Sequence, residues 1–240
     1  MKSRMTVGMV FAAGMVLNAA AGAAEGELPG LPWQMAGNNH VLVGVVWNEE
    51  VLKIVPKGLS ATPERTGGIN IYHSPRGYGA APYQSGYGWI DLAGQDAADG
   101  SKARYIFRAG VGPTENITKA FTSIWGSGIR SGGTRLESSG GTLQATGMMN
   151  GKVWGAVTIK TSDQCGNAGG TLNYFIPSAD GSKISKMQIP FSTIACGAEP
   201  VSAEINFPDA DIAGVKPEKL LWAAELREAA FGFTQPVAWK

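Results

Sequence analysis

The distribution of glycine restricts the fold of this chain more than any other feature. The 240-residue sequence contains 34 glycines, most of them in short clusters between apolar runs. Glycine enters tight turns at little cost but weakens the interior of a helix. The pattern therefore favours many short strands joined by tight turns over a helical bundle.

Apolar or alternating runs supply the candidate strands. Residues 40–47 (HVLVGVVW) are rich in valine and predict a buried strand, and residues 68–73 (GINIYH) alternate as a strand does. Further runs of this kind cover residues 86–92, 103–109, 143–148, 153–161, 172–176, 184–194 and 201–207. Asn150-Gly151 predicts a hairpin turn between two of these strands.

Three segments have helical spacing instead. Residues 49–55 predict a short helix, and residues 114–125 predict a longer one with Thr114 as its cap. Residues 216–230 predict a closing helix with Pro217 in its first turn and leucines along one stripe. We expect irregular chain over residues 25–39 and no element in the Gly, Ser and Thr run at residues 126–141. The predicted class is α+β, mainly antiparallel β.

The first 24 residues have the layout of a secretory signal. Lys2 and Arg4 precede an uncharged apolar run over residues 5–17, and small residues at Ala23 and Ala24 suit cleavage. A membrane anchor is the alternative, but a bilayer span takes about 20 apolar residues. The sequence thus predicts a periplasmic or secreted protein, one domain over residues 25–240, and no stable membrane span after signal removal.

Charge and cysteine content restrict the partners. The chain has 20 basic and 19 acidic residues, and loss of Lys2 and Arg4 leaves 18 (20 − 2) against 19. A near-neutral protein has no field to hold phosphates, so nucleic acid is not an expected partner. The only cysteines, Cys165 and Cys196, most simply form a disulfide that adds about 3–4 kcal/mol of stability in an oxidising compartment. A nucleophilic cysteine is the alternative, but no activating histidine lies near either one in sequence.

The sequence holds no motif for a metal or a cofactor, and none is expected. Its two histidines, His40 and His73, have no paired spacing, and there is no CxxC or HExxH. No glycine cluster has the dinucleotide or P-loop pattern. The segment 126–128 matches the GxSxG nucleophile elbow only in part.

Polar and aromatic residues gather between positions 70 and 91: Asn70, Tyr72, His73, Arg76, Tyr78, Tyr83, Gln84, Tyr87 and Trp89. They could form a solvated hairpin with stacked rings, or one wall of a pocket for a small-molecule ligand or substrate. Alternation in GINIYH puts Asn70 and Tyr72 on one face and His73 on the other. An inward-facing Asn70 must find a hydrogen-bond partner or a ligand.

The order of elements resembles the acetoacetate decarboxylase family. Residues 41–59 (VLVGVVWNEEVLKIVPKGL) are similar to its early strand, helix and turn, and residues 68–92 to its second strand and glutamate-bearing loop. The likeness continues through TGMMNGKVWGAVTIKT and LNYFIP. The resemblance implies an acetoacetate decarboxylase-like β-barrel or cone with a few peripheral helices. It also implies a homo-oligomer, because the family often assembles into rings.

The residues that carry the family's chemistry are replaced here. In the family a buried lysine, its amine pKa lowered by desolvation and a second lysine, forms a Schiff base with a β-keto acid. The matching stretch, residues 125–132 (WGSGIRSG), has no lysine, and the family's glutamates fall at Asn70 and Gln84. Lys119 is the nearest lysine but lies on the polar side of the predicted helix, so only a shifted register would restore the mechanism.

Two functional hypotheses follow. The first is an exported enzyme acting on a small carbonyl or carboxylic compound by lyase, hydratase or isomerase chemistry without a Schiff base. Its candidate catalytic residues are Tyr72, His73 and Gln84, and its candidate substrate-binding residues are Asn70, Tyr83, Tyr87 and Arg130, whose guanidinium would hold an acid group. The second is a non-catalytic binder of a small apolar or aromatic molecule, since neutral amides bind polar groups without supplying a strong proton acceptor. Nothing specific in the sequence indicates a purely structural envelope protein.

Overall fold

The computed structural model describes residues 30–80, 82–178, 180 and 182–239, so the predicted signal segment lies outside the described residues. Its elements are β1 (Trp33–Trp47), η1 (Glu49–Ile54), β2 (Thr66–Ser74), β3 (Arg76–Tyr78), β4 (Tyr83–Asp91), β5 (Ala103–Gly112), α1 (Glu115–Trp125), η2 (Gly126–Gly128), β6 (Ile129–Ser139), β7 (Thr142–Met149), β8 (Lys152–Pro177), β9 (Ile184–Ile205), β10 (Pro217–Phe233) and β11 (Val237–Ala238). Within these residues no helix has the length and apolarity needed to cross a membrane.

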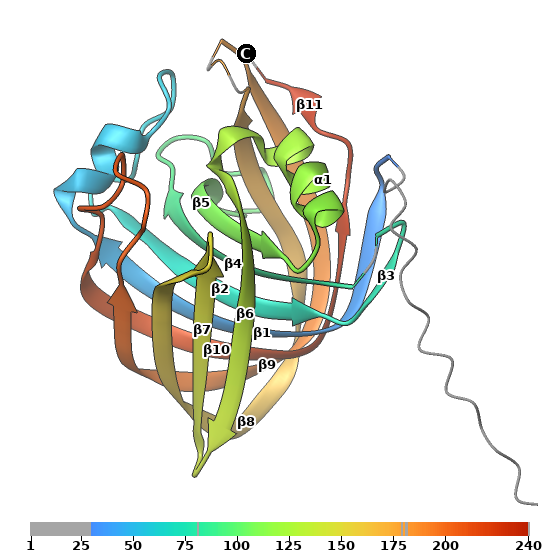
Figure 1. The fold of residues 1–240 in the computed structure, drawn as a ribbon, viewed down its shortest axis with the longest axis vertical. Coiled ribbons are helices and arrows are strands. Elements are labelled where there is room, and N and C mark those ends of the chain that lie inside the picture. Colours follow the sequence, from blue (N-terminus) through green and yellow to red (C-terminus); the bar gives the residue numbers. More distant parts are fainter. Residues whose placement is uncertain (1–29, 81, 179, 181, 240) are drawn as a thin grey trace, which may run out of the picture.

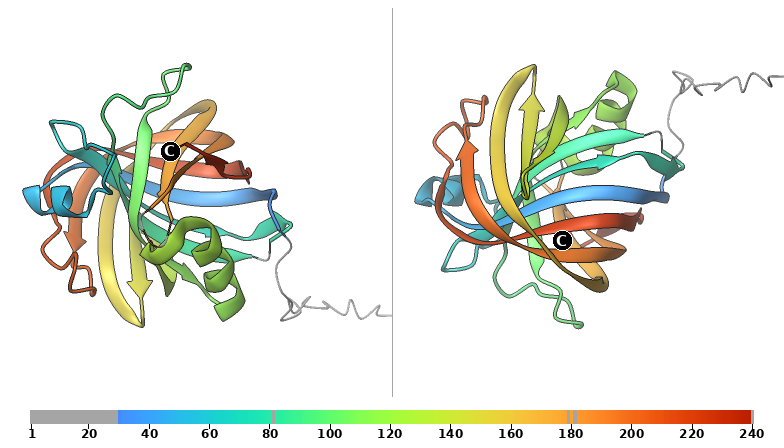
Figure 2. Two further views of the ribbon diagram at one scale, coloured as in Figure 1. Left: turned by 90° about the horizontal axis from the view of Figure 1, so that it is seen from above. Right: turned by 90° about the horizontal axis from the view of Figure 1, so that it is seen from below.

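The strands form one ring-like sheet (Figure 1). Its path runs β10-β1-β2-β4-β5-β6-β7-β8-β9-β11, and β10 also pairs with β9, which closes the ring. Nearly all neighbours are antiparallel; β5 runs parallel to β6 at one end and to β8 at the other. Views along the vertical axis show α1 beside the curved strands and outside the sheet (Figure 2). The mainly antiparallel α+β class is confirmed.

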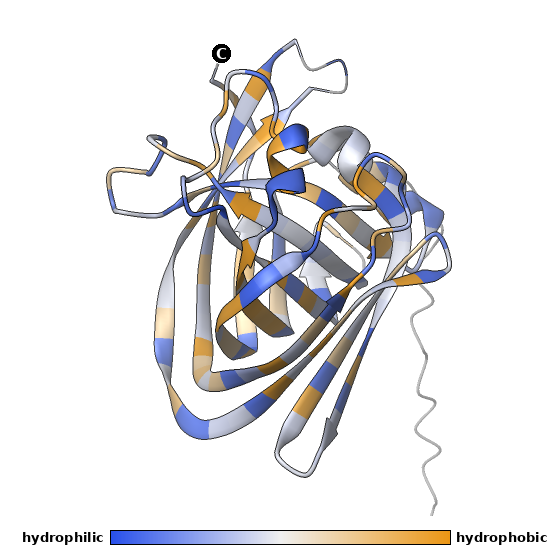
Figure 3. Cartoon of the chain, turned by 90° about the vertical axis from the view of Figure 1, so that its left-hand side faces the viewer, coloured by the Kyte–Doolittle hydropathy of each residue, from blue (hydrophilic) through white to orange (hydrophobic). Residues whose placement is uncertain are grey.

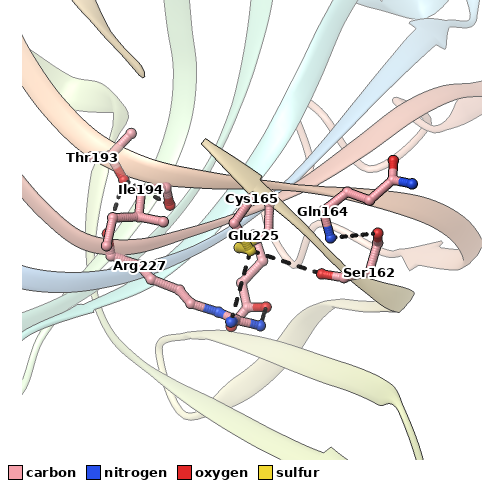
Figure 4. The surroundings of a disulfide bond; sticks show 8 residues. Ser162, Gln164, Cys165, Thr193, Ile194, Glu225 and Arg227 are labelled. Carbon is pink, nitrogen blue, oxygen red and sulfur yellow. Dashed lines mark hydrogen bonds and ion pairs between the residues drawn. A yellow bond between two sulfur atoms is a disulfide. The ribbon is translucent and has the colours of Figure 1, made fainter. Parts of the chain in front are cut away.

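Two pairs of predicted strands are continuous in the structure. The runs at 153–161 and 172–176 both belong to β8, and those at 184–194 and 201–207 fall largely within β9. The glycine-rich chain between them stays paired, and Cys165 lies directly opposite Cys196 in the β8–β9 ladder. Their sulfur atoms are bonded at 2.07 Å, beside Arg227 and the carbonyl of Ser162 (Figure 4). The predicted disulfide is confirmed.

The turn and helix signals in the middle of the chain are also confirmed. The Thr114 hydroxyl caps α1 by accepting from the Ile117 amide at 3.3 Å, as short polar residues do at helix starts. Asn150 and Gly151 have positive φ angles of 49° and 74°, the conformation a two-residue hairpin requires. The short helix after β1 is a 3₁₀ helix.

Three expectations about local structure are wrong. Residues 216–230 form most of strand β10 and no helix, because their backbone pairs with β1 on one side and β9 on the other. Such tertiary pairing outweighs the helical preference of leucine, alanine and glutamate. The stretch 33–39, expected to be irregular, already belongs to β1, and the Gly, Ser and Thr run contains β6.

Hydrophobic and hydrophilic residues alternate along the strands, as the coloured bands show (Figure 3). Because alternate side chains point to opposite faces of the sheet, this alternation divides the interior into two regions. On one face lies a fully apolar cluster, called the dry core below, which includes Val43, Trp47, Ile71, Phe107, Trp154 and Phe207. The other face of β1, β2 and β4 is covered by α1 and by the later part of β8. This second region holds the candidate site.

Candidate functional site

A cavity of about 280 Å³ lies on the face of the sheet opposite the dry core. Strands β1, β2, β4, β5, β8, β9 and β10 contribute alternate side chains, and α1 covers the space with Phe121 and Trp125. Most of the lining is apolar, for example Leu42, Ile106 and Phe231. None of the described residues that line the cavity is a lysine, an aspartate or a glutamate.

His40 is the buried titratable group of this wall. Its ring stacks on Tyr72 with centroids 4.4 Å apart and planes 8° apart, and the residue is 7% exposed. Burial lowers the pKa of His40 from 6.5 to about 4, against the opposing effect of a hydrogen bond to Asn70. The imidazole is therefore neutral near pH 7.

The proton of His40 can be assigned from its neighbours. The amide Nδ2 of Asn70 donates to the Tyr87 hydroxyl at 2.9 Å, and that hydroxyl lies 3.0 Å from the hydroxyl of Tyr174. Nδ1 of His40 lies 3.2 Å from Oδ1 and 3.1 Å from Nδ2 of Asn70, but Nδ2 already donates to Tyr87, whereas Oδ1 has no other donor among the described residues. A proton on Nδ1 satisfies this buried acceptor, so we assign that tautomer. Nε2 of His40 then carries a lone pair, and it has no hydrogen-bond partner.

The tyrosines around His40 stay protonated. The hydroxyls of Tyr72 and Tyr83 are 2.7 Å apart, and both rings are buried. Burial raises the pKa of Tyr72 and Tyr83, and that of Tyr87, well above the usual value of 10. These hydroxyls can donate and accept hydrogen bonds, but they do not supply a base at neutral pH.

Two tryptophans line one end of the cavity, called its mouth below. Trp222, on β10, is 42% exposed and folds over Gly44, while Trp89 is 2% exposed and folds over Gly68 in the next strand. A Cβ atom on either glycine would overlap the indole, so these strands need glycine there. Arg104 completes the mouth, with its guanidinium carbon 5.1 Å from the centroid of Trp89.

The structure brings only some of the predicted site residues together. Asn70, Tyr72 and Tyr87 line the cavity, and Tyr83 joins them through the hydroxyl of Tyr72. Ring nitrogen Nε2 of His73 instead lies 3.0 Å from the backbone oxygen of Thr134, on the other face of β2.

Gln84 and Arg130 also lie outside the cavity lining. Oε1 of Gln84 accepts from the Thr134 amide at 2.9 Å, since Gln84 pairs with His73 and shares its face. Arg130 binds the Asp209 carboxylate with its Nε, 3.1 Å from Oδ2, while the preceding residue, Ile129, faces the cavity. The expected pocket shared by His73, Gln84 and Arg130 is therefore not what the structure assembles.

Lys119 is exposed on α1 and pairs with Glu115 at 2.7 Å. It lies on the polar side of the helix, as its spacing predicted.

Sequence reasoning missed several residues of the site, among them His40, Arg104 and Trp222. His40 begins a valine-rich run that reads as uniformly buried, yet alternation pairs it with Leu42 and Gly44 on the cavity face. Arg104 shares the cavity face of β5 with the apolar Ile106. A polar residue at an inward position of such a strand is the signal that could have found both.

Comparison with known proteins places the fold. No family model matches the chain, and no curated protein matches its sequence. Among solved structures, acetoacetate decarboxylase from Legionella pneumophila superposes with a TM-score of 0.70 at 12% identity over 98% of each chain. The enduracididine biosynthesis enzyme MppR complexed with pyruvate gives 0.65 at 9% identity, covering 95% of this chain and 97% of that chain. An acetoacetate decarboxylase-like enzyme from Sphingomonas wittichii RW1 gives 0.60 at 9% identity, covering 87% and 93%.

The fold and the cavity together define the class: a protein with a closed, mainly antiparallel sheet and a ligand-sized cavity. More particularly, the chain has the acetoacetate decarboxylase-like fold, as the order of its elements predicted.

Proposed function

We propose that this is an exported pocket protein that holds a small, largely apolar molecule without a covalent bond. The observation that carries the proposal is Nε2 of His40, which is buried without a hydrogen-bond partner in a residue that lines an apolar cavity; in the assigned tautomer this nitrogen is an acceptor. A buried acceptor left unpaired costs about 1–3 kcal/mol, and a ligand hydroxyl or amide proton would remove that cost. The ligand should therefore combine an apolar or aromatic body with one hydrogen-bond donor.

Non-covalent binding follows from the lining. An imine requires an amine beside the ligand, and none of the described lining residues supplies one. Lys119 is exposed and ion-paired on the polar side of α1. Borohydride reduction in the presence of pyruvate should leave the mass of the protein unchanged, and a permanent adduct on any lysine would contradict this step.

The hydrogen bond to His40 can be tested with two ligands of nearly equal shape. 4-Propylphenol offers a donor and 4-propyltoluene, in which a methyl group replaces the hydroxyl, does not, so calorimetric titration should find the phenol bound about tenfold more tightly. The variant His40→Phe keeps a ring against Tyr72 but removes the acceptor, and should bring the two affinities within about twofold. The matched control His73→Phe changes the histidine on the opposite face of β2 and should leave the preference intact.

Equal binding of the two ligands by the native protein would contradict the role of His40. Absence of binding by both, and by further aromatic alcohols of this size, would contradict the pocket function itself.

Catalysis remains a second candidate because the solved structures with this fold include enzymes. The candidate chemistry is lyase, hydratase or isomerase work on a small carbonyl or carboxylic compound, with His40 receiving a proton on Nε2. Burial makes this histidine a weak base, which is why we place binding first. If the native protein shows turnover, and His40→Phe abolishes it but still binds a neutral ligand, catalysis becomes the first candidate.

Export is part of the proposal and rests on the N-terminal pattern together with the disulfide, since disulfides persist in oxidising compartments. Expression of the full chain in a Gram-negative bacterium should yield periplasmic protein that begins after Ala23 or Ala24, as read by intact mass. An uncleaved protein in the cytoplasmic fraction would contradict it.

A further inference from the structure

We propose that the cavity selects an amphipathic organic anion whose carboxylate binds Arg104 at the mouth while its apolar body lies against Trp89 and Trp222. This rests on the proposed function and narrows its ligand class, because a neutral apolar molecule would leave the arginine unused.

The donors of Arg104 are not satisfied within the described part of the chain. Its guanidinium makes no hydrogen bond to another described residue, and its Nε is buried without a partner. The nearest carboxylate, Asp91, lies 3.6 Å from Nε, which is an ion pair beyond hydrogen-bonding distance. Asp91 itself accepts from the Trp89 indole at 3.2 Å. A guanidinium placed in this way offers its fork to an incoming carboxylate.

Arg108, four residues further along β5, is more closely paired with carboxylates. Its Nη2 donates to Asp211 at 2.6 Å, and its Nε, which like that of Arg104 makes no hydrogen bond, forms an ion pair with Asp209 at 3.1 Å. Arg108 therefore holds two carboxylates and has a structural role. The difference between the two arginines marks Arg104 as the one available to a ligand.

The register of the strands places Arg104 and His40 toward opposite ends of the cavity. Arg104 lies opposite Asp91 on β4. His40 lies opposite Tyr72, and Tyr72 opposite Ser85, also on β4. Six residues (91 − 85) separate these two positions of β4, or about 20 Å along the strand at 3.3 Å per residue. A small aromatic acid held by Arg104 would therefore lie at the mouth with its apolar body directed toward His40, and it would not need to reach that residue.

The rest of the mouth suits an anion with a flat body. The indoles of Trp89 and Trp222 supply apolar contact surfaces, and Arg104 already lies over one of them. No acidic residue is among the described residues that line the cavity, and the carboxylate nearest to Arg104, that of Asp91, lies outside this lining and accepts from the Trp89 indole. A cationic ligand would meet the guanidinium first and be disfavoured.

The test uses a matched pair of probes that share a phenol end: 3-(4-hydroxyphenyl)propionate and its primary amide. Calorimetric titration at pH 7 and low salt should find the acid bound at least tenfold more tightly than the amide. Arg104→Gln should weaken the acid about tenfold and change the amide less than threefold, and Arg104→Lys should retain part of the preference. The control Arg135→Gln removes an exposed arginine on β6 that pairs with Glu137 and should change neither affinity.

The outcomes separate this inference from the proposed function. If the amide binds the native protein as tightly as the acid, or if neither binds while 4-propylphenol does, the anion selectivity is wrong and the pocket function stands. If the acid, the amide and 4-propylphenol all fail to bind, the proposed function fails with it. Should Arg104→Gln not fold, the native acid-to-amide ratio and Arg104→Lys still decide the matter.

Discussion

The dry core and the cavity are built from the same strands, yet the dry core is filled by apolar side chains whereas the cavity leaves space beside polar ones. On β2, Ile69 and Ile71 are fully buried among apolar side chains of the dry core. Their neighbours Asn70 and Tyr72 face a space of about 280 Å³ and form hydrogen bonds with Tyr87 and Tyr83. The comparison teaches that one face of a sheet can hold the fold together while the other keeps groups free for a ligand.

The largest difference should appear in two tryptophans, one from each region. Trp154 is 1% exposed and stacks on Phe207 with centroids 5.1 Å apart, so Trp154→Ala should lower the free energy of unfolding by about 3–5 kcal/mol. Trp222 at the mouth is already 42% exposed, so Trp222→Ala should cost less than about 1.5 kcal/mol. Urea unfolding followed by circular dichroism measures both.

For ligand binding we expect the opposite order, with Trp222→Ala having a larger effect than Trp154→Ala. Trp222→Ala should weaken binding of 4-propylphenol by removing part of the mouth. Equal losses of stability in Trp154→Ala and Trp222→Ala would mean that the dry core and the cavity contribute equally to the stability of the fold.

A smaller, pH-dependent difference follows from His40. Its pKa is about 4 in the folded protein and about 6.5 when unfolded, so the neutral form stabilises the fold fully above pH 6.5. As the pH falls from 6.5 toward 4, only the unfolded chain takes up the proton, and stability declines by about 3 kcal/mol. Unfolding free energies measured at pH 7.5 and pH 4.5 should show this decline in the native protein.

Variants of His40 on β1 and His73 on β2, which lie on opposite faces of the sheet, assign the decline to its source. His40→Phe should lose less stability than the native protein between the two pH values, by most of that 3 kcal/mol. His73→Phe also removes one imidazole, but from the face opposite the cavity. It should keep the native decline, and a flattened profile in this variant would count against His40 as the source.

The two regions also differ in how well the sequence predicts them. Periodicity locates most strands and α1, because apolar positions repeat at two or at three to four residues wherever one side is buried. It does not locate β10, whose leucine, alanine and glutamate content favours a helix until β1 and β9 pair with both of its edges. The disulfide could be predicted because only one pairing exists for Cys165 and Cys196.

The candidate site could be predicted only in part, because a residue belongs to it only if its side chain points into the cavity. Asn70 and Tyr72 were placed by alternation within one strand. Arg130 was not, since a shift of one residue puts Ile129 inward and turns the arginine toward Asp209. The role of His40 could not be predicted because its hydrogen bond with Asn70 joins residues thirty positions apart (70 − 40), which no local pattern reveals.

The smallest difference should separate the two arginines of β5. Arg108→Met removes a buried guanidinium that lies between Asp209 and Asp211 and should cost about 2–3 kcal/mol, since one of those carboxylates is left partly buried. Arg104→Met removes only a distant ion pair and a ring contact, so it should cost less than about 1 kcal/mol. Urea unfolding at pH 7 compares the two. A loss for Arg104→Met as large as that for Arg108→Met would show that Arg104 also serves the fold, and that its unpaired donors are not reserved for a ligand.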